Sequence, residues 1–216
     1  MRKVAVTIVL AAAIAAGAGD AKAPGVSTFD KDTVGNAPEG FSFARTGKGP
    51  EGTWVIQKAD DAPSAPNVLA QTSTDDTDVR FPVAVRNEGT WKDLVVSVKF
   101  KAVSGQTDQA GGVVFRYQDA NNYYLVRANA LEDNIRIYAV KDGERRQFES
   151  KSLKVPPGKW HAIKVEARGS HFTVSFDGQE AFQADDKTFD APGKVGVWTK
   201  ADSVTQFDDL SVEEAK

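Results

Sequence analysis

Residues 113–129 read VVFRYQDANNYYLVRAN, and this stretch indicates how the chain folds. Two runs of apolar and aromatic residues flank the polar break Asp119-Ala120-Asn121-Asn122. Within each run the apolar side chains recur with a period of two, which is typical of a β-strand that buries one face. The stretch therefore predicts a β-hairpin whose loop is formed by residues 119–122.

Alternation divides the predicted hairpin into two faces. In the register set by this loop, the opposite pairs are Gln118–Tyr123, Arg116–Leu125 and Val114–Arg127. One face is apolar and is predicted to lie in the core: Val113, Phe115, Tyr117, Tyr124, Val126 and Ala128. The other face is mixed and contains Val114, Arg116, Gln118, Tyr123, Leu125, Arg127 and Asn129.

The same period of two continues from Phe41 to the C-terminus, without convincing helical periodicity. Asp142-Gly143 and Asp177-Gly178 favour two-residue hairpin loops, because both residue types tolerate positive φ. The expected strands are 41–46, 53–58, 67–72, 80–85, 93–104, 111–118, 122–129, 134–142, 144–153, 159–168, 171–178, 179–185, 194–201 and 205–214. Short strands at this spacing predict an all-β sandwich or barrel.

The first residues are predicted to be a signal peptide. Met1-Arg2-Lys3 is positively charged, residues 4–18 are apolar, and small residues follow, so cleavage is expected between residues 18 and 23. The alternative is a membrane anchor, but this Ala- and Gly-rich segment is too short to span a bilayer stably. We expect one domain over residues 24–216, exported to the periplasm or secreted, without a membrane anchor after cleavage.

Composition excludes several classes of function. The chain has no cysteine, so neither a disulfide nor a thiol nucleophile is expected. A net charge of −3 without a basic stripe argues against a nucleic-acid partner. The two histidines, His161 and His171, lack the spacing of a zinc-binding pair.

Three segments carry a resemblance to a known superfamily: FRYQDANNYY (115–124), PPGKWHAIKVE (156–166) and GKVGVWTKADSVTQFDDL (193–210). Together with the order of the strands, they resemble the concanavalin A-like lectin/glucanase superfamily. The pattern covers residues 28–214 and is most similar to the 3-keto-disaccharide hydrolase domain family and to laminin-G-like jelly rolls. The resemblance implies two curved antiparallel sheets packed face to face, with a concave face that binds saccharides in many members.

The mixed face of the hairpin is the first candidate ligand-binding surface. Arginine and asparagine donors suit hydroxyls or a carboxylate, and an aromatic ring can stack on a sugar. The alternative is an ordinary solvated face on which the arginines pair with acidic neighbours. Trp198, Lys200 and Asp202 are a second candidate group, with Trp198 either a stacking platform or a packing residue. The candidate ligand-binding residues are Arg116, Tyr123, Arg127, Asn129, Trp198 and Lys200.

Catalytic residues are harder to choose. The E-x-D-x-(x)-E motif of family 16 glycoside hydrolases in this superfamily, which sets two carboxylates close together, is absent. Asp119, Glu132 and Glu166 are candidate acids or bases, and none of them stands out. Catalysis of the family 16 type is therefore not expected.

The resemblance also implies a structural calcium ion near the first and last strands, because several members hold one there. Asp208 in the last strand and Asp30 near the start would supply hard oxygen ligands. The alternative is that both carboxylates accept hydrogen bonds from turn amides. The expected cofactor is thus calcium or none.

Three functions follow from these observations. The first is an exported domain that binds carbohydrate on its concave sheet without catalysis. The second is a hydrolase or lyase acting on a (3-keto-)disaccharide or a related glycoside, as the resemblance implies. The third is a structural or adhesion module of the cell envelope.

Overall fold

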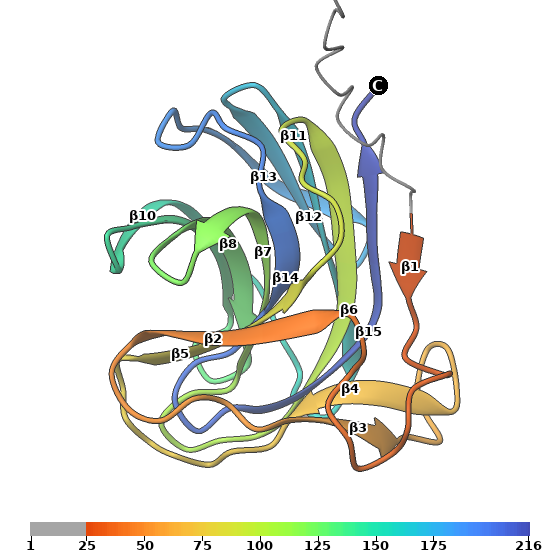
Figure 1. Ribbon diagram of the computed structural model, residues 1–216. Helices are drawn as coiled ribbons and strands as arrows, with labels where there is room; N and C mark the ends of the chain where they lie inside the picture. Colours follow the sequence, from red (N-terminus) through yellow and green to blue (C-terminus); the bar gives the residue numbers. More distant parts are fainter. Residues whose placement is uncertain (1–24) are drawn as a thin grey trace, which may run out of the picture.

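A computed structural model describes residues 25–216, so the predicted signal peptide lies outside the described residues. Two antiparallel sheets pack face to face in this part of the chain (Figure 1). The predicted all-β sandwich of the jelly-roll type is therefore confirmed. Within residues 25–216 no helix has the length and apolar character needed to cross a membrane.

One sheet, here called the outer sheet, has eight strands in the order β13-β12-β11-β6-β15-β4-β3, and β1 also pairs with β15. Its strands are β1 (Gly25–Ser27), β3 (Trp54–Lys58), β4 (Asn67–Gln71), β6 (Leu94–Ser104), β11 (Trp160–Arg168), β12 (His171–Phe176), β13 (Gln179–Asp185) and β15 (Val204–Glu214).

The inner sheet has seven strands in the order β10-β9-β8-β7-β14-β5-β2. They are β2 (Phe41–Gly47), β5 (Arg80–Arg86), β7 (Ala110–Asp119), β8 (Asn122–Asn129), β9 (Asn134–Lys141), β10 (Glu144–Ser152) and β14 (Lys194–Trp198). Every strand expected from the sequence is present near its expected bounds, and β1 is an addition. Asp142-Gly143 and Asp177-Gly178 have positive φ and form the hairpin loops, as predicted.

The main core lies between the two sheets. Alternate residues of each strand point into it, among them Phe100 on β6, Phe115 on β7 and Phe172 on β12, all fully buried. Phe115 and Phe172 meet edge to face with ring centroids 5.6 Å apart, which joins the two sheets. Burial of these apolar faces is the main force that holds the sandwich together.

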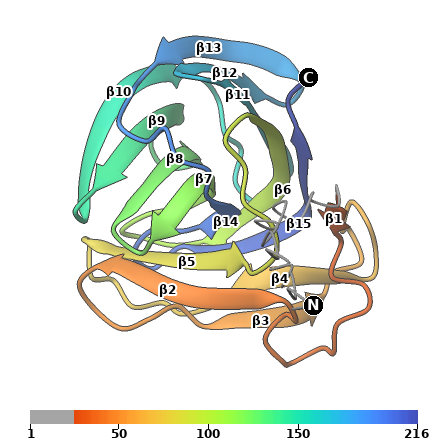
Figure 2. The same cartoon turned by 45° about the horizontal axis from the view of Figure 1, so that its top comes forward.

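The inner sheet is strongly curved. In Figures 1 and 2, β10, β9 and β8 curl round toward β5 and β2. Side chains on distant strands consequently meet on the face turned away from the outer sheet: Thr46 on β2 bonds to Tyr123 on β8, and Arg145 on β10 lies against Phe81 on β5. This face is the concave face of the sandwich.

A β-bulge corrects the predicted hairpin register. The observed pairs are Gly112–Arg127, Val114–Leu125 and Phe115–Tyr124, two residues away from the prediction, and the register shifts between Phe115 and Asp119. Arg116 has a φ of 45° within this bulge. A Cβ on Gly193 would lie 2.3 Å from the carbonyl carbon of Arg116, so only glycine allows β14 to approach the bulge.

The bulge also exchanges two predicted faces. Arg116 leaves the concave face and lies near Tyr124 and Phe172 of the main core. Tyr117, which was predicted to face the main core, lies on the concave face instead and stacks on Tyr123, with ring centroids 5.6 Å apart. The alternation of the rest of the hairpin is as predicted.

Candidate functional site

The concave face has a buried apolar layer, here called the apolar floor. It comes from alternate residues of β5, β7, β8, β9 and β14: Phe81, Val83, Val85, Ala110, Val114, Tyr123, Leu125, Tyr138, Val140 and Trp198. Because the sheet curls round these side chains, they fill the space that a flat sheet would leave open to solvent.

Trp198 belongs to this floor. Its ring is on the concave face but has no solvent exposure, and it stacks on Phe81 with centroids 5.7 Å apart and planes 13° apart. The sequence left Trp198 open as either a stacking platform or a packing residue. The observed burial makes it a packing residue beneath the surface.

Tyr123, also part of the apolar floor, forms a hydrogen bond between strands β8 and β2. Its hydroxyl lies 2.7 Å from the Thr46 hydroxyl, which donates its own hydrogen to the carbonyl of Ala120. Thr46 therefore accepts from Tyr123, and the bond connects β8 to β2 across the curved sheet. Burial raises the pKa of Tyr123, so the phenol stays neutral.

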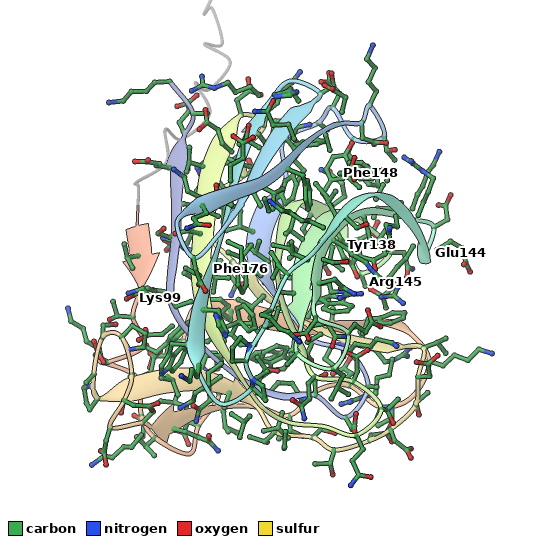
Figure 3. All side chains as sticks on the ribbon, turned by 180° about the vertical axis from the view of Figure 1, so that it is seen from behind. Lys99, Tyr138, Glu144, Arg145, Phe148 and Phe176 are labelled. Atoms are coloured by element: carbon green, nitrogen blue, oxygen red, sulfur yellow. The ribbon has the colours of Figure 1, made fainter. Side chains whose placement is uncertain are left out.

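Arg145 covers the floor. It extends from the edge strand β10, and its guanidinium carbon lies 3.9 Å from the ring centroid of Phe81, 5.4 Å from Tyr138 and 5.8 Å from Trp198. Four strands separate β10 from β5 in the sheet order, so only curvature brings Arg145 and Phe81 together. Figure 3 shows Arg145 beside Tyr138 on the hairpin of β9 and β10.

Charged side chains border the floor where β8 ends and β7 begins. This group, here called the polar rim, consists of Asp78, Asp108, Arg127, Glu132, Arg136 and Lys200. Lys200 Nζ lies 3.1 Å from Asp108 Oδ2 and 2.6 Å from Asp78 Oδ1. Asn129 Nδ2 donates to the other oxygen of Asp108, at 2.8 Å.

Glu132 connects the two arginines of the polar rim, Arg127 and Arg136. Its Oε2 lies 2.8 Å from Arg127 and 3.3 Å from Arg136, and it accepts a hydrogen bond from Asn134. Arg127 also bonds to Tyr138, with 3.2 Å between Nη2 and the hydroxyl. Each of these side chains is held in one orientation by at least one partner.

Two of the three carboxylates of the rim, Asp108 and Glu132, differ in the direction of their pKa shift. Burial raises the pKa of Asp108, although the neighbouring Lys200 opposes this shift. Burial alone would also raise the pKa of Glu132, but hydrogen bonds from Asn134 and Arg127 and the charges of Arg127 and Arg136 outweigh it and lower the pKa. Asp108 is therefore the more easily protonated of the two.

Asp202 positions the loop that carries Asp108. Its carboxylate accepts hydrogen bonds from the backbone N–H groups of Gln106, Thr107 and Asp108, at distances from 2.6 to 3.1 Å. Three consecutive N–H groups around one carboxylate form an anion-binding nest. The burial of Asp108 thus depends on a residue that lies close after Lys200 in the sequence.

Two other predicted ligand-binding residues, Arg116 and Asn129, are buried. Arg116 is 1% exposed and donates to the carbonyls of Lys92, Phe189 and Gly169, so its predicted position on the concave face was wrong. The cause is the bulge. Asn129 is buried, and its Oδ1 accepts from the backbone of Leu131 and Glu132.

The candidate catalytic residues do not come together. Asp119 accepts hydrogen bonds from Asn121 and Asn122 in the β7–β8 turn, at the opposite end of β8 from Glu132. Glu166 is on β11 of the outer sheet and pairs with Arg168 at 2.7 Å. Among these three residues only Glu132 belongs to the polar rim.

The predicted calcium ligands bond to the loop before β4. Asp208 accepts from the backbone N–H of Ser64 at 2.8 Å and from its hydroxyl at 3.0 Å, and Asp30 accepts from the N–H of Asn67 at 3.2 Å. Residues 25–216 contain no group of three or more His, Cys, Asp or Glu side chains that could hold a metal. Calcium at this place stays a prediction.

Several residues of the concave face, among them Asp78, Asp108, Arg136, Tyr138 and Arg145, were not predicted as ligand-binding or catalytic residues. Arg136 and Tyr138 alternate with apolar residues in NIRIYAV (134–140), so their face was readable from the period of two. Asp108 lies just before β7, and Arg145 lies on β10, most of whose residues are charged. For these two the sequence carries no local signal, because their roles depend on contacts with distant strands.

Comparisons with known proteins agree with this fold. The model of the family described as 3-keto-alpha-glucoside-1,2-lyase-like domain matches residues 30–213, while no curated protein matches the chain. Carbohydrate-binding module CBM66 from Bacillus subtilis has a TM-score of 0.65 at 20% identity, over 81% of this chain and 96% of that chain. The GH43 protein BlXynB from Bacillus licheniformis has a TM-score of 0.58 at 20% identity, over 88% of this chain and 39% of that chain.

Proposed function

The chain belongs to the family of 3-keto-alpha-glucoside-1,2-lyase-like domains, and on this premise we propose that its concave face binds carbohydrate without cleaving it. The ligand would rest on the polar rim, because the apolar floor beneath is already filled by protein side chains. The name of CBM66 as a carbohydrate-binding module, carried by a structure of the same fold, supports this class of ligand.

The observation that carries the proposal is the fixed geometry of the rim. Specific recognition of a sugar needs donors and acceptors that are held in place but still reach solvent. Glu132 meets this requirement, since it is tied to Arg127 and Arg136 and its side chain is 40% exposed. Lys200 is similarly held between two carboxylates and remains partly exposed.

Glycan-array binding of the purified protein, followed by calorimetry on the best ligand, tests the proposal. Glu132→Gln should weaken binding by about 10-fold or more, because the charged acceptor that orients two arginines is lost. Glu180→Gln is the matched control, since Glu180 is exposed on β13, away from the rim, and its side chain accepts a hydrogen bond from Gln183. Equal affinity of wild type and Glu132→Gln would refute a site on the rim, and no glycan bound would favour a structural role.

A second candidate function is the elimination that the family description names. A 1,2-lyase acting on a 3-keto-glucoside needs a base to take the proton from C2, while the C1–O bond breaks and the leaving oxygen gains a proton. Asp108 favours this candidate, because it is a buried carboxyl with a raised pKa and has the Lys200 ammonium 3.1 Å away.

Incubation with a 3-keto-α-glucoside separates the two candidates. A lyase would release the leaving group together with an unsaturated sugar seen by mass spectrometry, and Asp108→Asn would abolish this release. Asp119→Asn, in the distant turn, would leave it unchanged. Binding of the glycoside without any product supports the noncatalytic function.

Export completes the proposal. The positively charged start and the apolar segment of residues 4–18 support a signal peptide. Mass spectrometry of the protein recovered from the periplasm or medium should then show an N-terminus between residues 19 and 24. Recovery of the intact chain from the cytoplasm would contradict export.

A further inference from the structure

Three buried arginines elsewhere in the sandwich each donate at least three side-chain hydrogen bonds. Arg80 donates from Nε, Nη1 and Nη2 to backbone carbonyl oxygens, and Arg116 does the same with three other carbonyls. Arg127 bonds to three side chains of the concave face. A guanidinium has five N–H donors, and burying them without acceptors is costly. Hydrogen bonds to a buried arginine side chain are therefore expected.

Arg145 differs from all three. It is half-buried, and its guanidinium lies against the aromatic rings of Phe81, Tyr138 and Trp198, while its side chain has no hydrogen bond or salt bridge within residues 25–216. The rings restrain the guanidinium through cation–π attraction but accept none of its hydrogens in the usual way. Its donors are thus left for solvent or for a ligand on the concave face.

No carboxylate of residues 25–216 lies within salt-bridge distance of the Arg145 guanidinium. Burial is the main cause that lowers the pKa of Arg145, and the like charge of Arg127 acts in the same direction, while Tyr138 and Asp108 oppose the shift. The acids of the polar rim are Asp78, Asp108 and Glu132, and each is already paired with Lys200 or with the arginines of the rim. An anionic group placed over Arg145 would therefore form a direct ion pair that no carboxylate of residues 25–216 forms.

Resting on the proposed function, we propose that Arg145 binds a carboxylate and that the saccharide taken by the concave face is a uronate. The planar fork of a guanidinium matches the two oxygens of a carboxylate, which gives two parallel charge-assisted hydrogen bonds. Contact with Phe81 restrains the guanidinium before the ligand arrives, so less rotamer entropy is lost on binding. A neutral sugar would leave the charge uncompensated.

Calorimetry with a panel of oligouronates, each paired with its carboxyl-reduced neutral form, tests this inference. The wild-type protein should bind the oligouronate at least about 10-fold more tightly than the neutral form, and the preference should weaken with added salt. Arg145→Gln should remove the preference, whereas Arg145→Lys should keep part of it because the charge remains but the fork does not. Arg168→Gln, an equal change on the outer sheet, should leave it unaltered.

The outcomes distinguish the inference from the function on which it rests. Equal binding of both forms, or a preference that survives in Arg145→Gln, overturns the uronate assignment while carbohydrate binding stands. Tighter binding of sulfated than of carboxylated oligosaccharides also overturns it. Failure of every glycan to bind removes both proposals. Unchanged far-UV circular dichroism of each variant ensures that the comparison is made on folded protein.

Discussion

Replacing Asp202 with asparagine tests whether one carboxylate holds the loop that carries Asp108. In the native protein both oxygens of Asp202 accept backbone hydrogens, Oδ2 from Gln106 at 2.6 Å and Oδ1 from Asp108 at 2.9 Å, and both share the N–H of Thr107. The asparagine side chain would keep one acceptor and would set an amide N–H against a backbone N–H. One charge-assisted hydrogen bond is lost and one buried donor is left unpaired.

These two losses give the size of the effect. Hydrogen bonds to charged groups contribute about 1.5–3 kcal/mol and an unpaired buried donor costs about 1–3 kcal/mol, so we expect a loss of roughly 2–4 kcal/mol of unfolding free energy after partial relaxation. In a domain of this size that corresponds to a fall in Tm of roughly 5–15 °C.

The effect should depend on pH in a defined direction. Burial alone would raise the pKa of Asp202, but the backbone hydrogen bonds outweigh it and lower the pKa. The stabilisation is therefore fully present above the unfolded pKa of about 3.9 and is lost as pH falls through the lower folded pKa. The difference between wild type and Asp202→Asn should persist from neutral pH to about pH 4 and shrink below it.

Urea denaturation followed by tryptophan fluorescence measures the difference. Asp76→Asn is the control, because Asp76 is exposed in a nearby loop and has no side-chain hydrogen bond within residues 25–216, and its unfolding free energy should change by less than about 0.5 kcal/mol. A change equally small in Asp202→Asn, or a difference that grows as the solution is acidified, would refute the reasoning.

Three other results are expected. For Asp186, burial alone would raise the pKa, but hydrogen bonds from Thr188 and Arg146, among others, lower it to about 2. Asp186→Asn should therefore destabilise the protein above the unfolded pKa of about 3.9. In an acid titration followed by near-UV circular dichroism, the difference between the variant and the wild type should vanish as the pH approaches 2. Phe81→Ala should cost about 3–5 kcal/mol in urea denaturation, because it opens a cavity under Trp198, and a loss below about 1 kcal/mol would contradict a packed floor. If calcium binds at Asp208, chelation should lower Tm in wild type but not in Asp208→Asn, and identical melting with and without chelator would exclude it.

The strands could be predicted because their signal is local. Each strand buries one face, so the period of two is written into segments such as NYYLVRAN, and Asp-Gly turns mark where the chain reverses. The face taken by Arg116 could not be predicted in this way. Its bulge exists because β14 passes close enough that Gly193 touches it, and this contact joins residues far apart in the sequence.

The candidate site was predicted in part for the same reason. Alternation placed Arg127 on the mixed face of the hairpin and Lys200 on the same face as Trp198, and both are found in the polar rim. Arg145 was missed because ERRQFESKS resembles an ordinary solvated edge strand. Its contact with Phe81 depends on the curvature of the whole sheet, which no window of sequence contains.

The position of β10 at the open edge of the inner sheet has a consequence for protein engineering. An exposed edge strand can pair with the edge of another molecule, and charged side chains and bulges are the usual protection against such aggregation. β10 has both, with a register shift between Gln147 and Glu149 and charge along most of its length. Substitutions that widen the aromatic surface around Arg145 at the expense of these charges would therefore lower solubility before they improved affinity.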